Sequence, residues 1–183
     1  MLYFIFICAV FCQTATENSD KNSNIEGKVE GLPRSFHEIG LGMGLDDVKE
    51  TLKLDESFAY RGDRDVSLLQ SRNRSVIESE GVYFVKRGSF QFYNEKLYTI
   101  IVQMNPENID YYSIYSSLIE KYGEPGFIDQ KKAIWENEGV RLVLERPLTI
   151  KYIDTVVFNE IIASRNKKTA LSDEARANFV NAF

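Results

Sequence analysis

An internal echo constrains the fold of this chain more than any other feature of its sequence. Residues 75–88 align without gaps on residues 133–146, and both segments contain the pattern Glu-x-Glu-Gly-Val. A hairpin turn used twice explains the pattern, with glycine supplying a positive φ and the glutamates staying in solvent. The sequence therefore predicts two related hairpins.

Helix patterns precede both copies of the echo. Leu45, Val48 and Leu52 follow a glycine cluster at helical spacing, which predicts a helix over residues 45–54. A tyrosine-rich stripe predicts a second helix over residues 109–122, closed by Gly123. Each copy is thus expected to consist of a helix followed by strands.

Alternation of apolar and polar residues indicates strands over residues 97–104 and 148–153, and residues 92–97 are expected to form a hairpin turn. We therefore predict an α+β fold of two tandem helix-plus-β-meander repeats, with an antiparallel sheet and the helices packed on one face. The repeats are expected at about residues 39–104 and 105–162. Trp135, which aligns with Ile77, is expected in the core. A C-terminal helix at about residues 172–182, capped by Ser172, is expected to dock on this domain.

The first residues indicate export. Residues 1–12 are all apolar, and the first charged side chain is Glu17. About 20 apolar residues are needed to cross a bilayer, so this run is expected to be a signal segment. Cleavage after Cys12 would release a soluble protein, whereas residues 9–12 also resemble a loose lipobox in which Cys12 becomes an acylated N-terminus. The expected location is the periplasm or, through that anchor, the membrane of a bacterial envelope.

A polar segment separates the signal from the folded part. Residues 13–35 carry few aliphatic side chains, and so little apolar surface cannot offset the entropy of ordering a chain. We expect residues 13–35 to be a flexible tether and residues 36–183 to form a single domain.

Side chains suited to catalysis are scarce in the expected domain. Cys8 and Cys12 are the only cysteines and both lie in the apolar segment, which excludes thiol chemistry and disulfides from the domain. His37 is the only histidine and is expected to be an ordinary boundary residue. Asp46 and Asp47 are expected to stabilise a helix start rather than bind a metal. We therefore predict no enzymatic activity, no cofactor and no metal.

Charge bears on the class of partner. A net charge of -5 and a pI near 5.1 argue against nucleic-acid binding, and the basic run at residues 165–168 is too short to change that. Lys167 and Lys168 are expected to solvate a loop.

Two short patterns resemble a known family. Gly42-Met43, followed by Asp47-Val48 and Leu52, resembles the helix opening of the BamE-like (SmpA/OmlA) outer-membrane assembly lipoproteins, and residues 118–125 look like the helix exit of the same units. The β-lactamase inhibitor proteins share that architecture as two tandem copies. The resemblance implies helices on one face of an antiparallel sheet and a role in binding other proteins.

These observations together predict an exported, envelope-associated protein-binding or scaffolding module. Its partner is expected to be another envelope protein, and the sequence leaves the oligomeric state open. One alternative is a secreted hydrolase that uses Asp and Glu. Another is a host-adhesion protein that uses Arg61, Gly62 and Asp63, because an exposed Arg-Gly-Asp loop presents paired opposite charges.

Overall fold

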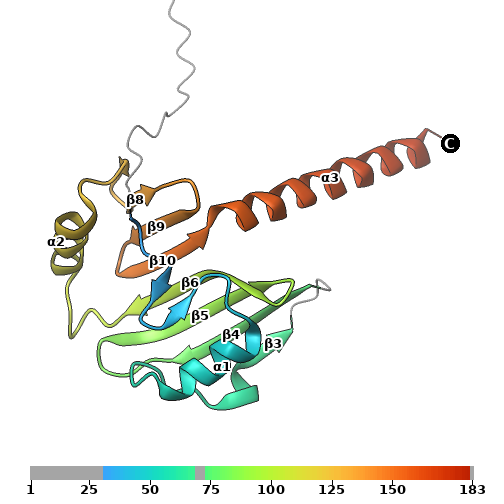
Figure 1. Ribbon diagram of the computed structural model, residues 1–183. Coiled ribbons are helices and arrows are strands. Elements are labelled where there is room, and N and C mark those ends of the chain that lie inside the picture. Colours follow the sequence, from blue (N-terminus) through green and yellow to red (C-terminus); the bar gives the residue numbers. More distant parts are fainter. Residues whose placement is uncertain (1–30, 69–72, 182–183) are drawn as a thin grey trace, which may run out of the picture.

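One large antiparallel sheet dominates the molecule. In the computed structural model, which describes residues 31–68 and 73–181, this sheet has eight strands in the order β3-β4-β5-β6-β10-β9-β8-β7 (Figure 1). The strands are β3 (Val66–Leu68), β4 (Arg74–Glu80), β5 (Val85–Tyr93), β6 (Lys96–Met104), β7 (Phe127–Ile128), β8 (Lys132–Glu136), β9 (Val140–Glu145) and β10 (Thr149–Asp154). A separate two-stranded sheet pairs β1 (Ser35–Phe36) with β2 (Ile39–Gly40).

The hydrophobic core lies on one face of the large sheet. Side chains on a strand point alternately to opposite faces, so Ile77, Phe90 and Ile100 stand side by side on this face and are fully buried. Trp135 is also fully buried, and its indole N–H donates a hydrogen bond to the carbonyl of Gly123 at 2.8 Å. The predicted core position of Trp135 is therefore confirmed.

Two helices pack against this core and begin where their sequences provide a cap. Helix α1 (Leu45–Leu54) has the predicted bounds, and the carboxylate of Asp47 accepts from the Gly44 N–H at 3.2 Å. Helix α2 (Tyr111–Tyr122) begins two residues later than predicted, because Asp110 caps it. Hydrogen bonds from the hydroxyl and N–H of Ser113 hold the pKa of the Asp110 carboxyl below its usual range.

The hairpin turn predicted for residues 92–97 is confirmed. Tyr93 pairs with Lys96, and the two residues between them, Asn94 and Glu95, have φ values of 49° and 62°. Positive φ at both central residues is the geometry that joins twisted strands through a two-residue turn.

The predicted fold class is wrong. The described residues form one continuous eight-stranded sheet, a small two-stranded sheet and three α-helices, rather than two helix-plus-meander repeats with their helices packed on one face. The strand groups β3–β6 and β7–β10 merge because β6 pairs with β10, from Gln103 opposite Thr149 to Thr99 opposite Ile153. The echo reflects a strand pattern shared by the β4–β5 and β8–β9 hairpins.

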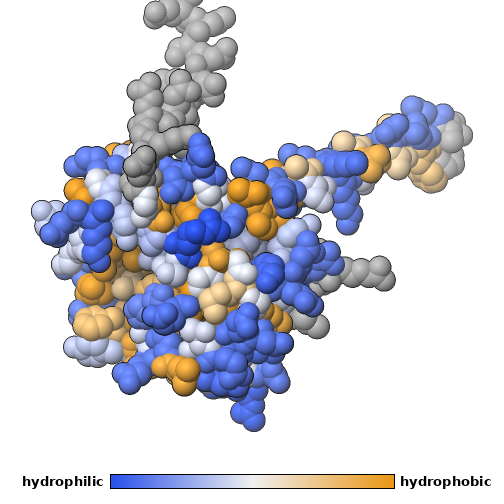
Figure 2. Space-filling view, viewed as in Figure 1, coloured by the Kyte–Doolittle hydropathy of each residue, from blue (hydrophilic) through white to orange (hydrophobic). Residues whose placement is uncertain are grey.

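The third helix accounts for the rest of that difference. Helix α3 (Thr155–Val180) has 26 residues and runs away from the sheet (Figure 1). The C-terminal helix expected at residues 172–182 is its outer part, and it does not dock, because residues 163–181 are all exposed. Hydrophobic residues are only scattered along its visible side (Figure 2), so this part has no apolar stripe to bury.

The described end of the expected tether belongs to the folded part. Leu32 is buried, and the Arg34 guanidinium lies 2.7 Å from the carboxylate of Asp154. The same carboxylate accepts from the N–H groups of Val156 and Val157 at the start of α3. Arg34 therefore fixes the incoming chain to the helix start, and residues 13–30 lie outside the described residues.

The role predicted for the two echo glycines is also wrong. Neither Gly81 nor Gly139 has a positive φ. A Cβ added to Gly81 would lie 2.3 Å from the carbonyl oxygen of Val85, so close backbone packing is what requires glycine there. Of the glutamates, Glu78, Glu80 and Glu138 are exposed, whereas Glu136 is half-buried.

Candidate functional site

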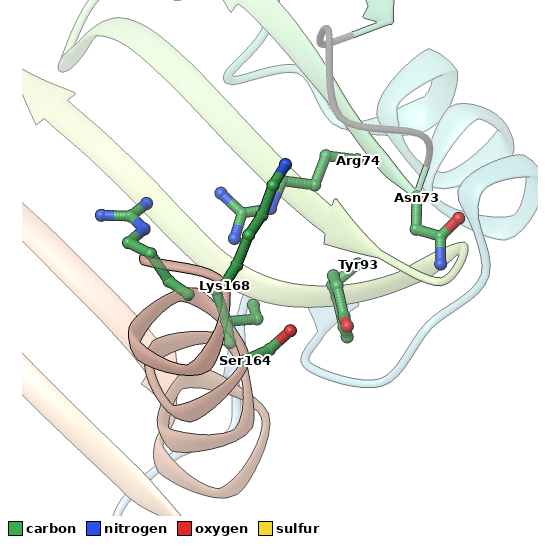
Figure 3. A pocket seen from close by; sticks show the side chains of 7 residues that line it. Asn73, Arg74, Tyr93, Ser164 and Lys168 are labelled. Carbon is green, nitrogen blue, oxygen red and sulfur yellow. The ribbon is translucent and has the colours of Figure 1, made fainter. Parts of the chain in front are cut away.

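A basic groove lies between α3 and the sheet, at the start of β4 and the end of β5. Its volume is about 540 Å³. Figure 3 shows Arg74 and Tyr93 on the sheet across from Ser164 and Lys168 on the helix. The lining residues, which define the basic groove below, are Asn73, Arg74, Tyr93, Ile161, Ser164, Arg165 and Lys168.

Local structure explains why these side chains meet. Arg74 opens β4 directly opposite Tyr93, the last residue of β5, so their side chains share one face of the sheet. That face is opposite the core. On α3 the four lining residues follow at spacings of three and four, which places them on one side of the helix. Ile161 is buried and holds this side of α3 against the sheet.

The groove is positively charged. Arg74, Arg165 and Lys168 line it, and none of its described lining residues is Asp or Glu. Within the described part of the chain, none of these three cations forms an ion pair. Three uncompensated cations around one hollow create a field that attracts an anionic group.

Arg74 also has an unused donor. Its Nε is buried and has no hydrogen-bond acceptor among the described residues. A buried N–H without an acceptor costs about 1–3 kcal/mol, and such a group calls for an explanation in a native protein. Because this atom has almost no accessible surface, an acceptor on a ligand would remove that cost once the half-buried Arg74 side chain turned toward the groove.

The positive charge of the groove arginines also acts on the hydroxyl of Tyr98, beside the groove. Burial raises the pKa of its hydroxyl, while the positive charges of Arg74 and Arg165 oppose that rise. The hydroxyl lies 3.1 Å from the side-chain oxygen of Gln91, to which it donates. Both groove arginines therefore act electrostatically on one buried phenol.

The side chains present suit binding better than catalysis. Arginine and lysine donate charge-assisted hydrogen bonds to carboxylates or phosphates, and Asn73, Tyr93 and Ser164 add neutral polar groups. No described lining residue is a carboxylate, a histidine or a cysteine. The groove thus presents donors for an anion without a general base of those kinds.

The structure places the sequence-predicted candidates elsewhere. The His37 Nδ1 lies 3.0 Å from the Asp55 carboxylate, and its ring stacks on Phe36. Asp47 caps α1, and Asp46 lies 3.5 Å from Lys49. The described residues contain no cluster of His, Cys, Asp and Glu that could hold a metal ion.

The Arg-Gly-Asp tripeptide lies at the start of a short 3-10 helix (Gly62–Asp65). Arg61 is the cap residue of this helix, and Gly62 and Asp63 are its first two residues. The Arg61 guanidinium donates two hydrogen bonds to Asp65, at 2.8 and 3.1 Å, and Asp63 lies 3.2 Å from Lys49. Both charged members of the tripeptide are therefore engaged within the protein.

The predicted signal segment, with Cys12, lies outside the described residues. No helix in the described part is long and apolar enough to span a bilayer.

Sequence reasoning missed the groove because it assigned residues 165–168 to a loop. On a helix, Arg165 and Lys168 are three residues apart and share a side with Ile161 and Ser164. This spacing indicates a shared side only if residues 161–168 are taken as helical. Arg74 lies far away in sequence and carried no signal of its own.

A family model described as the TP0088 domain matches residues 34–164. No curated protein and no solved structure matches the chain. The resemblance to the BamE-like lipoproteins stays a prediction. The match includes Arg74, Tyr93 and Ser164 and ends one residue before Arg165, so the groove spans the end of the family's domain. Because the model covers well over half of the sequence, the chain belongs to the TP0088 domain family.

Proposed function

We propose that this protein is an exported, envelope-associated binding module without enzymatic activity, and that its basic groove holds an acidic segment of a partner protein. The export part rests on the apolar residues 1–12. The binding part rests on one observation, which is a hollow lined by three cations, none of them paired within the described residues, with the Arg74 Nε buried and lacking an acceptor.

The geometry supports an acidic protein segment as the ligand. A carboxylate accepts two parallel hydrogen bonds from a guanidinium, and two arginines line the groove. Beyond the groove, α3 continues with exposed side chains to the end of its described residues, which offers a partner protein further surface. An acidic segment that entered the groove would therefore contact the sheet and the helix together.

The hydrolase alternative finds no support in the buried acids. The buried acidic residues among those described are Asp65 and Asp154, and an arginine binds each of them, Arg61 at 2.8 Å and Arg34 at 2.7 Å. The carboxylate of Asp55, whose side chain is 9% exposed, accepts from the Ser57 N–H and lies 3.0 Å from the His37 Nδ1. Asp65 ends a 3-10 helix and Asp154 caps α3. Each carboxylate therefore has a structural role of its own.

A matched pair of substitutions on α3 tests the proposal. Lys168→Glu places a negative charge in the groove, whereas Lys167→Glu makes the same change one residue away, outside the lining. We would measure the affinity of the full chain for a fluorescein-labelled hexaglutamate peptide by fluorescence anisotropy. Losing a charge-assisted hydrogen bond weakens binding by about tenfold or more, and this is expected for Lys168→Glu. Lys167→Glu should change the affinity much less.

Equal losses in the two variants would show that the peptide responds only to net charge, which would contradict the groove. The absence of measurable binding to the peptide at low salt would contradict it as well. A control peptide of six lysines should not lose affinity on Lys168→Glu, because the groove offers it only like charges.

A further inference from the structure

The turn between β4 and β5 presents three consecutive apolar side chains to solvent. Val82, Tyr83 and Phe84, called the aromatic turn below, connect β4 to β5 and are 46%, 66% and 46% exposed. The rings of Tyr83 and Phe84 meet edge to face, with centroids 4.3 Å apart. Three consecutive exposed apolar residues on a loop tip mark an interaction site more often than three scattered ones.

The surrounding structure holds this turn in a fixed shape. Tyr83 has a φ of 53°, a conformation that costs a non-glycine residue free energy and persists only where neighbours impose it. The side-chain amides of Asn105 and Asn108 both donate to the Tyr83 carbonyl, at 3.4 and 2.6 Å. The aromatic side chains are thus displayed by a rigid support.

Hydrogen bonds also occupy the carbonyls of the turn. The Val82 carbonyl accepts from the Val85 N–H at 3.1 Å, and the Phe84 carbonyl accepts from the Asn105 N–H at 2.8 Å. Together with the two asparagine amides on Tyr83, every carbonyl of the aromatic turn has a partner. The turn therefore has no free carbonyl that would have to give up water when its side chains contact an apolar surface.

We infer that the aromatic turn contacts a lipid bilayer and places Tyr83 and Phe84 at the level of the headgroups, where aromatic side chains are favoured. Lys86 is exposed and lies beside the turn, at the register shift between Val85 and Arg87. Its ammonium group can reach lipid phosphates. Glu107 in the loop before α2 is also exposed, so the turn has an acidic as well as a basic neighbour and the apolar side chains provide the attraction.

The chain outside the described residues argues for a bilayer rather than an apolar protein pocket. Residues 13–30 separate the apolar segment 1–12 from the folded part, and eighteen residues span at most about 60 Å. A domain tethered at that distance meets the membrane at a high effective concentration, so a weak contact suffices. This step rests on the export part of the proposed function, in the form in which an acylated Cys12 keeps the chain at the membrane, and is independent of the basic groove.

A tryptophan reporter at the turn tests whether this part of the surface is the one that contacts lipid. In the full chain, Tyr83→Trp would be compared with Leu54→Trp, a control at a site on α1 that is 84% exposed. Trp135 is fully buried and contributes a constant background. Vesicles of phosphatidylcholine and phosphatidylglycerol would be added, with and without brominated acyl chains. We expect the emission at position 83 to shift to shorter wavelength and to be quenched by bromine, and the emission at position 54 to change little.

A second measurement removes an apolar side chain of the turn. Phe84→Ser, added to Tyr83→Trp, should reduce the quenching by bromine at position 83, while the circular dichroism stays that of the parent. Unchanged emission at position 83, equal responses at positions 83 and 54, or unaltered quenching in the double variant would each overturn the inference. Loss of hexaglutamate binding in groove variants bears on the groove alone, so the two proposals fail separately.

Discussion

The two hairpins that share the Glu-x-Glu-Gly-Val pattern differ in whether their charged side chains have partners within the hairpin. In the β8–β9 hairpin, Glu136 stands opposite Arg141 and accepts two hydrogen bonds from its guanidinium, both at 2.9 Å. The aligned Glu78 stands opposite Ser89 and is exposed. In the β8–β9 hairpin the charged side chains pair with each other. The β4–β5 hairpin instead carries the aromatic turn at one end and the basic groove at the other.

The turns differ as well. Val82 and Val140 align without a gap, yet Val82 is 46% exposed in the aromatic turn and Val140 is 1% exposed at the start of β9. The strand of the second hairpin resumes directly after Gly139, while that of the first resumes only at Val85. The comparison teaches that equal strand patterns can support different turns. Both proposed contacts, the aromatic turn and the basic groove, lie on the β4–β5 hairpin.

The largest expected difference comes from the aligned core residues. Trp135→Ala should destabilise the fold by about 3–5 kcal/mol, because it leaves a cavity and removes the donor to Gly123. Ile77→Val, at the aligned position, should cost about 0.5–1.5 kcal/mol. Urea denaturation measures both. A loss below about 1 kcal/mol for Trp135→Ala would show that the core is not packed as described.

The echo glycines should separate next. Gly81→Ala would force a Cβ to within 2.3 Å of the Val85 carbonyl oxygen, and overpacking of this kind costs about 1–3 kcal/mol. At Gly139 the nearest atom to a new Cβ is the flexible end of Arg34, at 3.1 Å, so Gly139→Ala should cost much less. Thermal unfolding of the two variants compares them directly, and equal losses would mean that the close packing at Gly81 is absent.

Alkaline pH should distinguish the buried tyrosines of the two halves. Burial raises the pKa of Tyr152 to about 12, while the groove arginines oppose the rise at Tyr98. A raised folded pKa contributes stability that is complete below the unfolded value of 10.0 and is lost as pH rises toward 12. This loss is on the order of 2 kcal/mol for Tyr152. Tyr152→Phe should therefore remove more of the alkaline loss than Tyr98→Phe, as measured by denaturation from pH 9 to pH 12. A reversed order would argue against the groove field.

The smallest difference is expected from the aligned glutamates. Glu136→Gln breaks a half-buried, two-point pair with Arg141 and should cost about 1 kcal/mol at most. Glu78→Gln should leave stability nearly unchanged. Raising the salt concentration should narrow the gap between the two variants, because salt screens such pairs. A gap that does not respond to salt would assign the effect of Glu136 to packing instead.

Local patterns predicted the elements of this fold better than their assembly. Helix α1, the turn at Asn94-Glu95 and the burial of Trp135 depend on neighbouring residues, and the sequence displays those. The pairing of β6 with β10 joins residues about fifty positions apart, and no local pattern specifies it. The length of α3 was missed because its polar outer part lacks the apolar stripe by which amphipathic helices are recognised.

The candidate site followed the same division. Arg165 and Lys168 could be seen as a short basic run, but their meeting with Arg74 depends on where α3 leaves β10. Likewise, the capping role of Asp47 was local and predictable, while the engagement of Arg61 by Asp65 depends on a 3-10 helix that the sequence did not indicate.

One measurement tests the central claim that the groove binds an anionic segment. The Nε–Hε resonance of Arg74 can be followed by NMR in the full chain while hexaglutamate peptide is added. We predict a saturable shift of this resonance and slower exchange of its proton with water, both requiring a higher peptide concentration in Lys168→Glu and nearly unchanged in Lys167→Glu. A peptide that binds while the Arg74 resonance stays unchanged would contradict the claim.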